Sequence, residues 1–271
     1  MCYRLLAIDL DDTLLDNKCC VSPRTKEAIK KALDKGLYVT LATGRMYRSA
    51  LPYALELGMD VPLITYQGAL VKTSVTKEIL YHRPVPLELA KEVIREGEKR
   101  GFPSNIYLDD RLYVDRMTPE AEGYLKLAKV PAKEVGDLSS FLTEEPTKVL
   151  LMGEESKLNE LWPQMAQKFG KQLYITKSKP NFLEFTHPDA TKGQGLVAVS
   201  RFLGVKKEEI MVFGDSYNDL ELFKYAGFSV AMGNAREEVK KQADYITQNN
   251  DDDGVAEAIE KLVLNDSGCG R

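Results

Sequence analysis

A regular alternation of short apolar runs with helical stretches, at the start of the chain, constrains the fold more than any other feature. The apolar runs are residues 3–10, 37–43 and 62–66. One helix begins at Ser22-Pro23, where serine can cap it and proline fits its first position, and ends at Gly36, while a second ends near Gly58. This order predicts right-handed crossovers and an open, doubly wound parallel sheet with helices on both faces.

The same alternation of apolar runs and helical stretches occurs again towards the end of the chain. Helical patterns occur around 193–203, up to about 225 and up to about 264, and apolar strand patterns occur at 210–215 and 228–233. We expect these segments to share one sheet with the first 70 residues. About 120 residues lie between the two halves, which is far too many for a structureless loop in a compact fold, so they predict an inserted domain.

The insert has a mixed pattern of its own. Helices are predicted at 87–100, 118–129 and 155–169, and strands at 104–115, at 147–153 and near residues 172 and 182. This pattern favours a mainly antiparallel sheet covered by helices. The predicted fold class is therefore α/β, with a Rossmann-like doubly wound core formed by residues 1–83 and 189–271 and an inserted α/β domain at 84–188.

Composition excludes several classes of function. The net charge is -4 and no dense basic stripe is present, which argues against a nucleic-acid partner. No apolar run approaches the roughly 20 residues needed to cross a bilayer, so no membrane partner is expected. The four cysteines, at positions 2, 19, 20 and 269, lack paired C-x-x-C spacing and predict neither a zinc site nor a disulfide framework. We expect a reduced, cytoplasmic protein.

Polar residues gather at four points in the chain where an open parallel sheet is expected to bind ligands, at the carboxyl ends of its strands. The four segments are Asp9-Leu10-Asp11-Asp12-Thr13, Thr43-Gly44-Arg45, Lys192-Gly193 and Gly214-Asp215-Ser216-Tyr217-Asn218-Asp219. Together they contain several carboxylates, a hydroxyl group, a lysine and glycines that allow close backbone approach. The first segment lacks the glycine and glutamate positions of a calcium-binding EF-hand loop. The combination is typical of a site for magnesium and phosphate.

The chemistry of phosphate transfer explains why these residue types belong together. A phosphate monoester is a dianion that repels a carboxylate nucleophile, so positive charge must be concentrated beside it. Magnesium prefers oxygen ligands, which Asp9 and Asp215 can supply, and a lysine and backbone N–H groups add further positive charge. Asp9 is the candidate nucleophile and would form an aspartyl-phosphate that water then hydrolyses. Asp11 could protonate the departing alcohol and deprotonate that water.

All four segments, in this order, resemble the motifs of the haloacid dehalogenase (HAD) superfamily, and in particular of the Cof-like phosphatases with a large α/β cap. The resemblance covers essentially the whole chain. It implies a phosphatase of small phosphorylated metabolites, such as sugar phosphates, with Mg²⁺ as cofactor and the insert as cap. The implied metal ligands are Asp9, Asp11 through its carbonyl group, Asp215, and Asp219 through a bound water or Lys192. The implied phosphate-binding groups are the Leu10 N–H, Thr43, Gly44, Lys192 and Asn218.

Two positions depart from the family pattern. Asp12 stands where glycine is usual, which adds negative charge near the site. Gln67-Gly68 stands where Asn-Gly is common after the third strand, which could alter contacts near the cap hinge. We expect the mechanism to survive both changes.

Substrate choice is expected to depend on the cap, because the core residues recognise only phosphate and metal. The candidate contacts are Tyr107, Asp109, Arg111, Glu184 and His187. Two other functions stay open. A phosphosugar mutase of the same superfamily would retain the phosphate, and a non-catalytic, metabolite-binding regulator would be expected to lack Asp9, Asp11 or Lys192. We expect a monomer or a weak homodimer.

Overall fold

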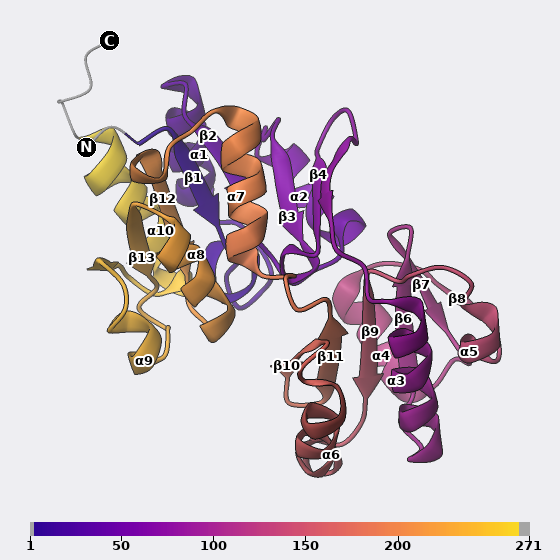
Figure 1. The fold of residues 1–271 in the computed structure, drawn as a ribbon. Coiled ribbons are helices and arrows are strands. Elements are labelled where there is room, and N and C mark those ends of the chain that lie inside the picture. The colour runs from indigo at the N-terminus through magenta and orange to yellow at the C-terminus, as the bar shows by residue number, and fades with distance from the viewer. Residues whose placement is uncertain (1–2, 266–271) are drawn as a thin grey trace. The chain divides into compact units, whose positions relative to one another are not determined.

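A computed structural model describes residues 3–265 of the chain (Figure 1). The described residues form two compact units, each with its own sheet. The first unit takes the residues up to 43, residues 50–81 and those from 191 onward, and the second takes residues 44–49 and 82–190. The boundaries 1–83, 84–188 and 189–271 remain a prediction from the sequence.

The sheet of the first unit has five parallel strands and joins the two ends of the chain. Its order is β14-β13-β12-β1-β2. The strands are β1 (Leu5–Ile8), β2 (Tyr38–Leu41), β12 (Ile210–Gly214), β13 (Phe228–Ala231) and β14 (Tyr245–Ile246). Because β1 pairs with both β2 and β12, the predicted sharing of one sheet by the two halves is confirmed.

Helices cover both faces of this sheet. The helices of the unit are α1 (Pro23–Asp34), α2 (Tyr47–Glu56), α7 (Lys192–Leu203), α8 (Leu220–Tyr225), α9 (Glu237–Lys240) and α10 (Gly254–Ile259). Leu5 and Ala7 belong to the apolar cluster that includes residues of α7 and α8. Side chains alternate along a strand, so Leu6 and Ile8 point to the opposite face. Figure 1 shows α7 and α8 in front of the sheet and α1 and α10 behind it, each pair in mutual contact.

The third predicted strand, β3 (Pro62–Thr65), differs from the expectation. Its strand pairing with the main sheet is a parallel bridge between Ala42 and Ile64, and the Thr40 hydroxyl group of β2 also donates to Pro62 O at 2.6 Å. Its regular partner is β4 (Leu70–Thr73), which runs antiparallel to it, and β5 (Ile79–His82) follows in the same three-stranded sheet. The hairpin was missed because its turn uses positive φ angles at Tyr66 and Gln67, which sequence rules assign mainly to glycine.

The second unit contains a six-stranded sheet in the order β10-β11-β9-β6-β7-β8. All its neighbours pair antiparallel except β7 and β8, which are parallel. The strands are β6 (Ser104–Leu108), β7 (Arg111–Val114), β8 (Ala132–Glu134), β9 (Lys148–Met152), β10 (Tyr174–Lys179) and β11 (Phe182–Thr186). The helices are α3 (Leu87–Lys99), α4 (Pro119–Ala128), α5 (Leu138–Phe141) and α6 (Glu155–Phe169). The predicted α/β class, with a mainly antiparallel insert, is confirmed.

Two observations bear on the predicted environment of the protein. Between residues 3 and 265, no helix combines the length and the apolar character that a membrane span requires. Cys19 and Cys20 are free thiols. The other two cysteines, Cys2 and Cys269, lie outside the described residues.

A buried ion pair lies in the sheet of the second unit. Lys148 of β9 and Glu184 of the neighbouring strand β11 are both almost fully buried, and their Nζ and Oε1 atoms are 3.0 Å apart. The ammonium group also lies 4.6 Å from the centre of the Tyr107 ring. Burial by itself lowers the pKa of Lys148, but the attraction of Glu184 outweighs it, so the pKa is raised overall. The lysine is therefore charged at neutral pH.

We predict that Lys148→Met lowers the free energy of unfolding by about 3–5 kcal/mol, because it leaves the Glu184 carboxylate buried without its counter-charge. The double variant Lys148→Met/Glu184→Leu should lose much less, since neither charge remains. Urea unfolding followed by circular dichroism measures both. A double variant that is less stable than the single one would contradict this account.

Candidate active site

The site begins where β1 ends. Asp9 follows Ile8 directly, and its side chain is 8% exposed. The N–H of Leu10 donates to Asp9 Oδ1 at 2.7 Å, so the carboxylate is held by its own neighbour in the chain. Residues Leu10–Leu14 then form a single wide turn, in which Asp12 has a φ of 58°. This turn places the Asp11 side chain in solvent and buries Thr13.

Lys192 joins two carboxylates from different parts of the chain. Its Nζ lies 2.7 Å from Asp9 Oδ1 and 2.7 Å from Asp219 Oδ1, and the side chain is 1% exposed. Thr191 is the N-cap of α7 and accepts the N–H of Gln194 through its hydroxyl oxygen, so the helix begins at Lys192. The first turn of α7 thereby holds the ammonium group at the end of β1.

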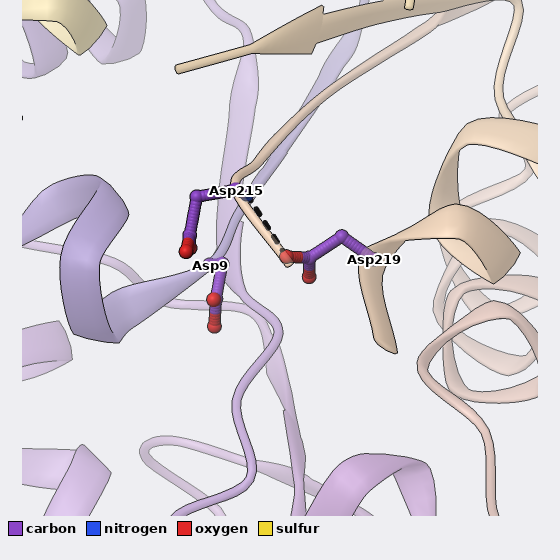
Figure 2. Close-up of side chains that lie close together, drawn as sticks. All are labelled: Asp9, Asp215 and Asp219. Carbon is purple, nitrogen blue, oxygen red and sulfur yellow. Dashed lines mark hydrogen bonds between the residues drawn. The ribbon is translucent and has the colours of Figure 1, made fainter. Parts of the chain in front are cut away.

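The fourth segment holds Asp215 and Asp219 in a tight turn after β12. Asp219 Oδ2 accepts the N–H of Asp215 at 3.0 Å (Figure 2) and also accepts the N–H of Ser216 at 3.0 Å. Gly214 makes this possible, because a Cβ atom at that position would lie 2.5 Å from Cβ of Asp219. Thr13 donates its hydroxyl to Asp215 Oδ1 at 2.9 Å, which ties the fourth segment to the first.

The charges of this cluster are unbalanced, since three carboxylates surround one ammonium group. Burial and the charge of Asp219 raise the pKa of Asp9 well above its usual range, against the lowering effect of Lys192. The same two causes raise the pKa of Asp215 to about 7. Burial by itself lowers the pKa of Lys192, but the charges of Asp219 and Asp9 raise it by more. The pKa is therefore raised overall and the lysine stays protonated. The site thus contains three carboxyl groups and one ammonium group, so carboxyl groups are in excess.

This excess of negative charge fits a divalent cation. Carboxylate oxygens of Asp9, Asp215 and Asp219 lie within 4.8 Å of one another. Asp219 has both oxygens engaged, one by Lys192 and one by two backbone N–H groups. Within the described part of the chain, one oxygen each of Asp9 and Asp215 accepts no hydrogen bond. These two oxygens are suited to a hard cation such as Mg²⁺.

The remaining predicted residues lie as follows. Thr43 is fully buried at the end of β2, with its N–H bonded to Ile64 O at 2.9 Å, and Gly44 belongs to the second unit. Asn218 donates its Nδ2 to Gln67 Oε1 at 2.9 Å. Asp12 is exposed and occupies the left-handed region, which aspartate tolerates better than most residues, so aspartate can stand where glycine is usual.

The candidate contacts of the second unit fall into two groups. Tyr107 and Glu184 are buried within the sheet, next to Lys148. The exposed pair Asp109 and Arg111 lies in the hairpin between β6 and β7, and half-buried His187 follows β11. Lys148 was not among the residues predicted from the sequence. A lone lysine inside the apolar run TKVLLMG was the signal that could have found it.

Comparisons with known proteins show the family and the fold. A family model described as haloacid dehalogenase-like hydrolase matches residues 6–259. The 5-amino-6-(5-phospho-D-ribitylamino)uracil phosphatase YitU of Bacillus subtilis is 31% identical over 264 residues, covering 95% of this chain and 96% of its own. A haloacid dehalogenase-like hydrolase from Bacteroides thetaiotaomicron superposes with a TM-score of 0.90 at 32% identity, covering 96% and 99% of the two chains. The subclass IIB sugar phosphatase BT4131 gives 0.81 at 27% identity, covering 95% and 98%.

We predict that Asp219→Ala lowers the free energy of unfolding by about 3 kcal/mol or more, because it leaves two partly buried N–H groups without an acceptor and removes one of the two carboxylates that hold Lys192. The nearby residue Glu221, whose side chain is 40% exposed, serves as control, and Glu221→Ala should change stability by less than about 0.5 kcal/mol. Chemical denaturation of both variants tests this. Equal stabilities would show that Asp219 does not hold the turn.

Proposed function

Because the chain belongs to the haloacid dehalogenase-like hydrolases and acts on phosphate monoesters, we propose that it is a magnesium-dependent phosphatase of small metabolites that works through an aspartyl-phosphate. The observation that carries the proposal is the Lys192 ammonium group, held 2.7 Å from both Asp9 and Asp219 beside Asp215. A lysine in this position lowers the pKa of Asp9 against the effects of burial and Asp219, and it adds positive charge where a phosphate dianion must approach.

In the first step, a carboxylate oxygen of Asp9 attacks phosphorus and the bond from phosphorus to the ester oxygen breaks. Asp11, two residues further along and exposed, gives its proton to the departing oxygen, which leaves as an alcohol. Lys192, the Leu10 N–H, Thr43, Gly44 and Asn218 are the groups that would hold the phosphoryl oxygens. The Leu10 N–H, which now donates to Asp9, must turn to the phosphoryl group for this role.

In the second step, water attacks the phosphorus of the aspartyl-phosphate. Asp11, now ionised, takes the proton of that water, and the bond between Asp9 and phosphorus breaks. The products are inorganic phosphate and the regenerated Asp9 carboxylate. The residue is thus restored to the state in which Lys192 pairs with it.

Asp9, the Asp11 carbonyl group and Asp215 would hold Mg²⁺. When bound, this ion supplies charge that offsets the phosphate dianion and the excess of carboxylates. We assign Asp219 a supporting part, because its two oxygens already hold Lys192 and the turn after β12.

The substrates we propose are small phosphorylated metabolites, with sugar phosphates as first candidates. YitU, by its name, acts on a phosphorylated ribitylaminouracil, and BT4131 is described as a sugar phosphatase. In both named substrate types the phosphate is attached to a polyhydroxylated group, a ribityl chain or a sugar, which supports testing this class first. A cytoplasmic location and a monomeric or weakly dimeric state remain predictions from the sequence.

We predict that Asp9→Asn lowers phosphate release by at least about a thousandfold, because the amide is not a competent nucleophile. The matched control is Asp34→Asn, an exposed aspartate of α1 that should retain full activity. Release of inorganic phosphate is measured with sugar phosphates and p-nitrophenyl phosphate, with Mg²⁺ and with EDTA. Turnover by Asp9→Asn at the wild-type rate would exclude Asp9 as nucleophile.

The raised pKa values predict a pH dependence. A carboxyl group whose pKa is raised on folding favours the folded state below its unfolded pKa, and this contribution is lost as pH rises through the folded value, which is about 7 for Asp215. Mg²⁺ favours the ionised form, so it should raise the unfolding temperature more at about pH 8 than at about pH 5.5. Thermal unfolding with MgCl₂ or EDTA tests this.

The control for this pH experiment is Asp215→Asn, in which the Mg²⁺-dependent increase should largely disappear at both pH values. An equal increase at both pH values in the wild type, or none, would contradict the assignment of these carboxylates to the metal.

A further inference from the structure

The turn that joins β3 to β4 has an unusual backbone. Tyr66, Gln67 and Gly68 have φ angles of 52°, 60° and 98°, three left-handed residues in succession. Only glycine adopts this region without strain, so Tyr66 and Gln67 are held there by their surroundings. Strained backbone of this kind is concentrated at functional sites.

The turn contacts three of the four segments that form the proposed site. The N–H of Gln67 donates to Thr43 O at 3.1 Å. Gly68 lies directly against the residue before Lys192, since a Cβ atom at Gly68 would be 2.0 Å from Thr191 O. The side chain of Gln67, which is 5% exposed, accepts a hydrogen bond from Asn218 Nδ2 through Oε1 at 2.9 Å. One short turn thus ties together the ends of β2, α7 and β12.

We propose that Gln67 is a positioning residue, whose side-chain carbonyl group orients the amide of Asn218 so that its second N–H can donate to a phosphate oxygen. The inference rests on the proposed function, in which Asn218 contacts the phosphate. An amide nitrogen carries two N–H groups, and Gln67 engages one of them.

The geometry gives Gln67 this role for two reasons. First, glycine would adopt the same φ angle with less strain, so the backbone of the turn does not require a glutamine. Second, Gln67 provides the one side-chain hydrogen bond to the Asn218 amide between residues 3 and 265, and Asn218 Oδ1 is buried without a partner there. Without Gln67, nothing in this part of the chain would fix the rotation of that amide.

The test uses Gln67→Gly, which removes the amide and relieves backbone strain, so that loss of folding does not obscure the result. We expect an unfolding temperature equal to or above that of the wild type. The KM for p-nitrophenyl phosphate and the inhibition constant for inorganic phosphate should both rise roughly 3- to 10-fold, as for loss of about one hydrogen bond, with kcat nearly unchanged.

A double-mutant cycle with Asn218→Ala separates positioning from a general structural effect. If Gln67 acts through Asn218, adding Gln67→Gly to Asn218→Ala should change KM by less than about twofold. Independent, additive effects of the two substitutions, or an unchanged KM in Gln67→Gly, would overturn the inference and leave the proposed function intact. Absence of phosphate release by the wild-type protein with Mg²⁺ would instead overturn the proposed function, and the inference with it.

Discussion

The ion pairs of Lys192 are the interactions on which the rest of the site depends. A buried ammonium group is stable only when opposite charge lies beside it, and here Asp9 and Asp219 supply that charge at 2.7 Å. The two aspartates follow different strands, β1 and β12, and the lysine starts α7. Their convergence requires the parallel pairing of β1 with β12, because this pairing brings the carboxyl ends of both strands to one edge of the sheet.

Around this centre, the polar contacts form a continuous set. Thr13 holds Asp215, Asp219 holds the turn after β12, and Gln67 holds Asn218. Each contact joins residues that are distant in the chain or belong to one tight turn. The arrangement leaves one oxygen each of Asp9 and Asp215 for a cation, while negative charge stays in excess. This excess of negative charge makes the protein less stable than matched charges would, which is consistent with the proposed cation site.

The second unit shows a different use of buried charge. Lys148 and Glu184 form a one-to-one pair between two buried strands, so each charge lies beside its counter-charge. The pair lies next to Tyr107, in the part of the chain where the sequence analysis looked for substrate contacts. Two of those five candidates are buried in this sheet, and the other three lie at its hairpin or at a strand end. The five residues therefore do not share one buried environment.

The sequence by itself determined the α/β class, the shared parallel sheet, the antiparallel insert and the family, because these follow from the order of apolar runs and from motifs a few residues long. Only the tertiary structure decided which atoms meet. The contacts of Lys192 with Asp9 and Asp219 and the Lys148–Glu184 pair join residues separated by tens to hundreds of positions, and local patterns carry no information about such contacts. The turn at Gln67 was missed for a related reason. Its left-handed backbone is imposed by Thr43, Thr191 and Asn218, and not by a local preference of its own residues.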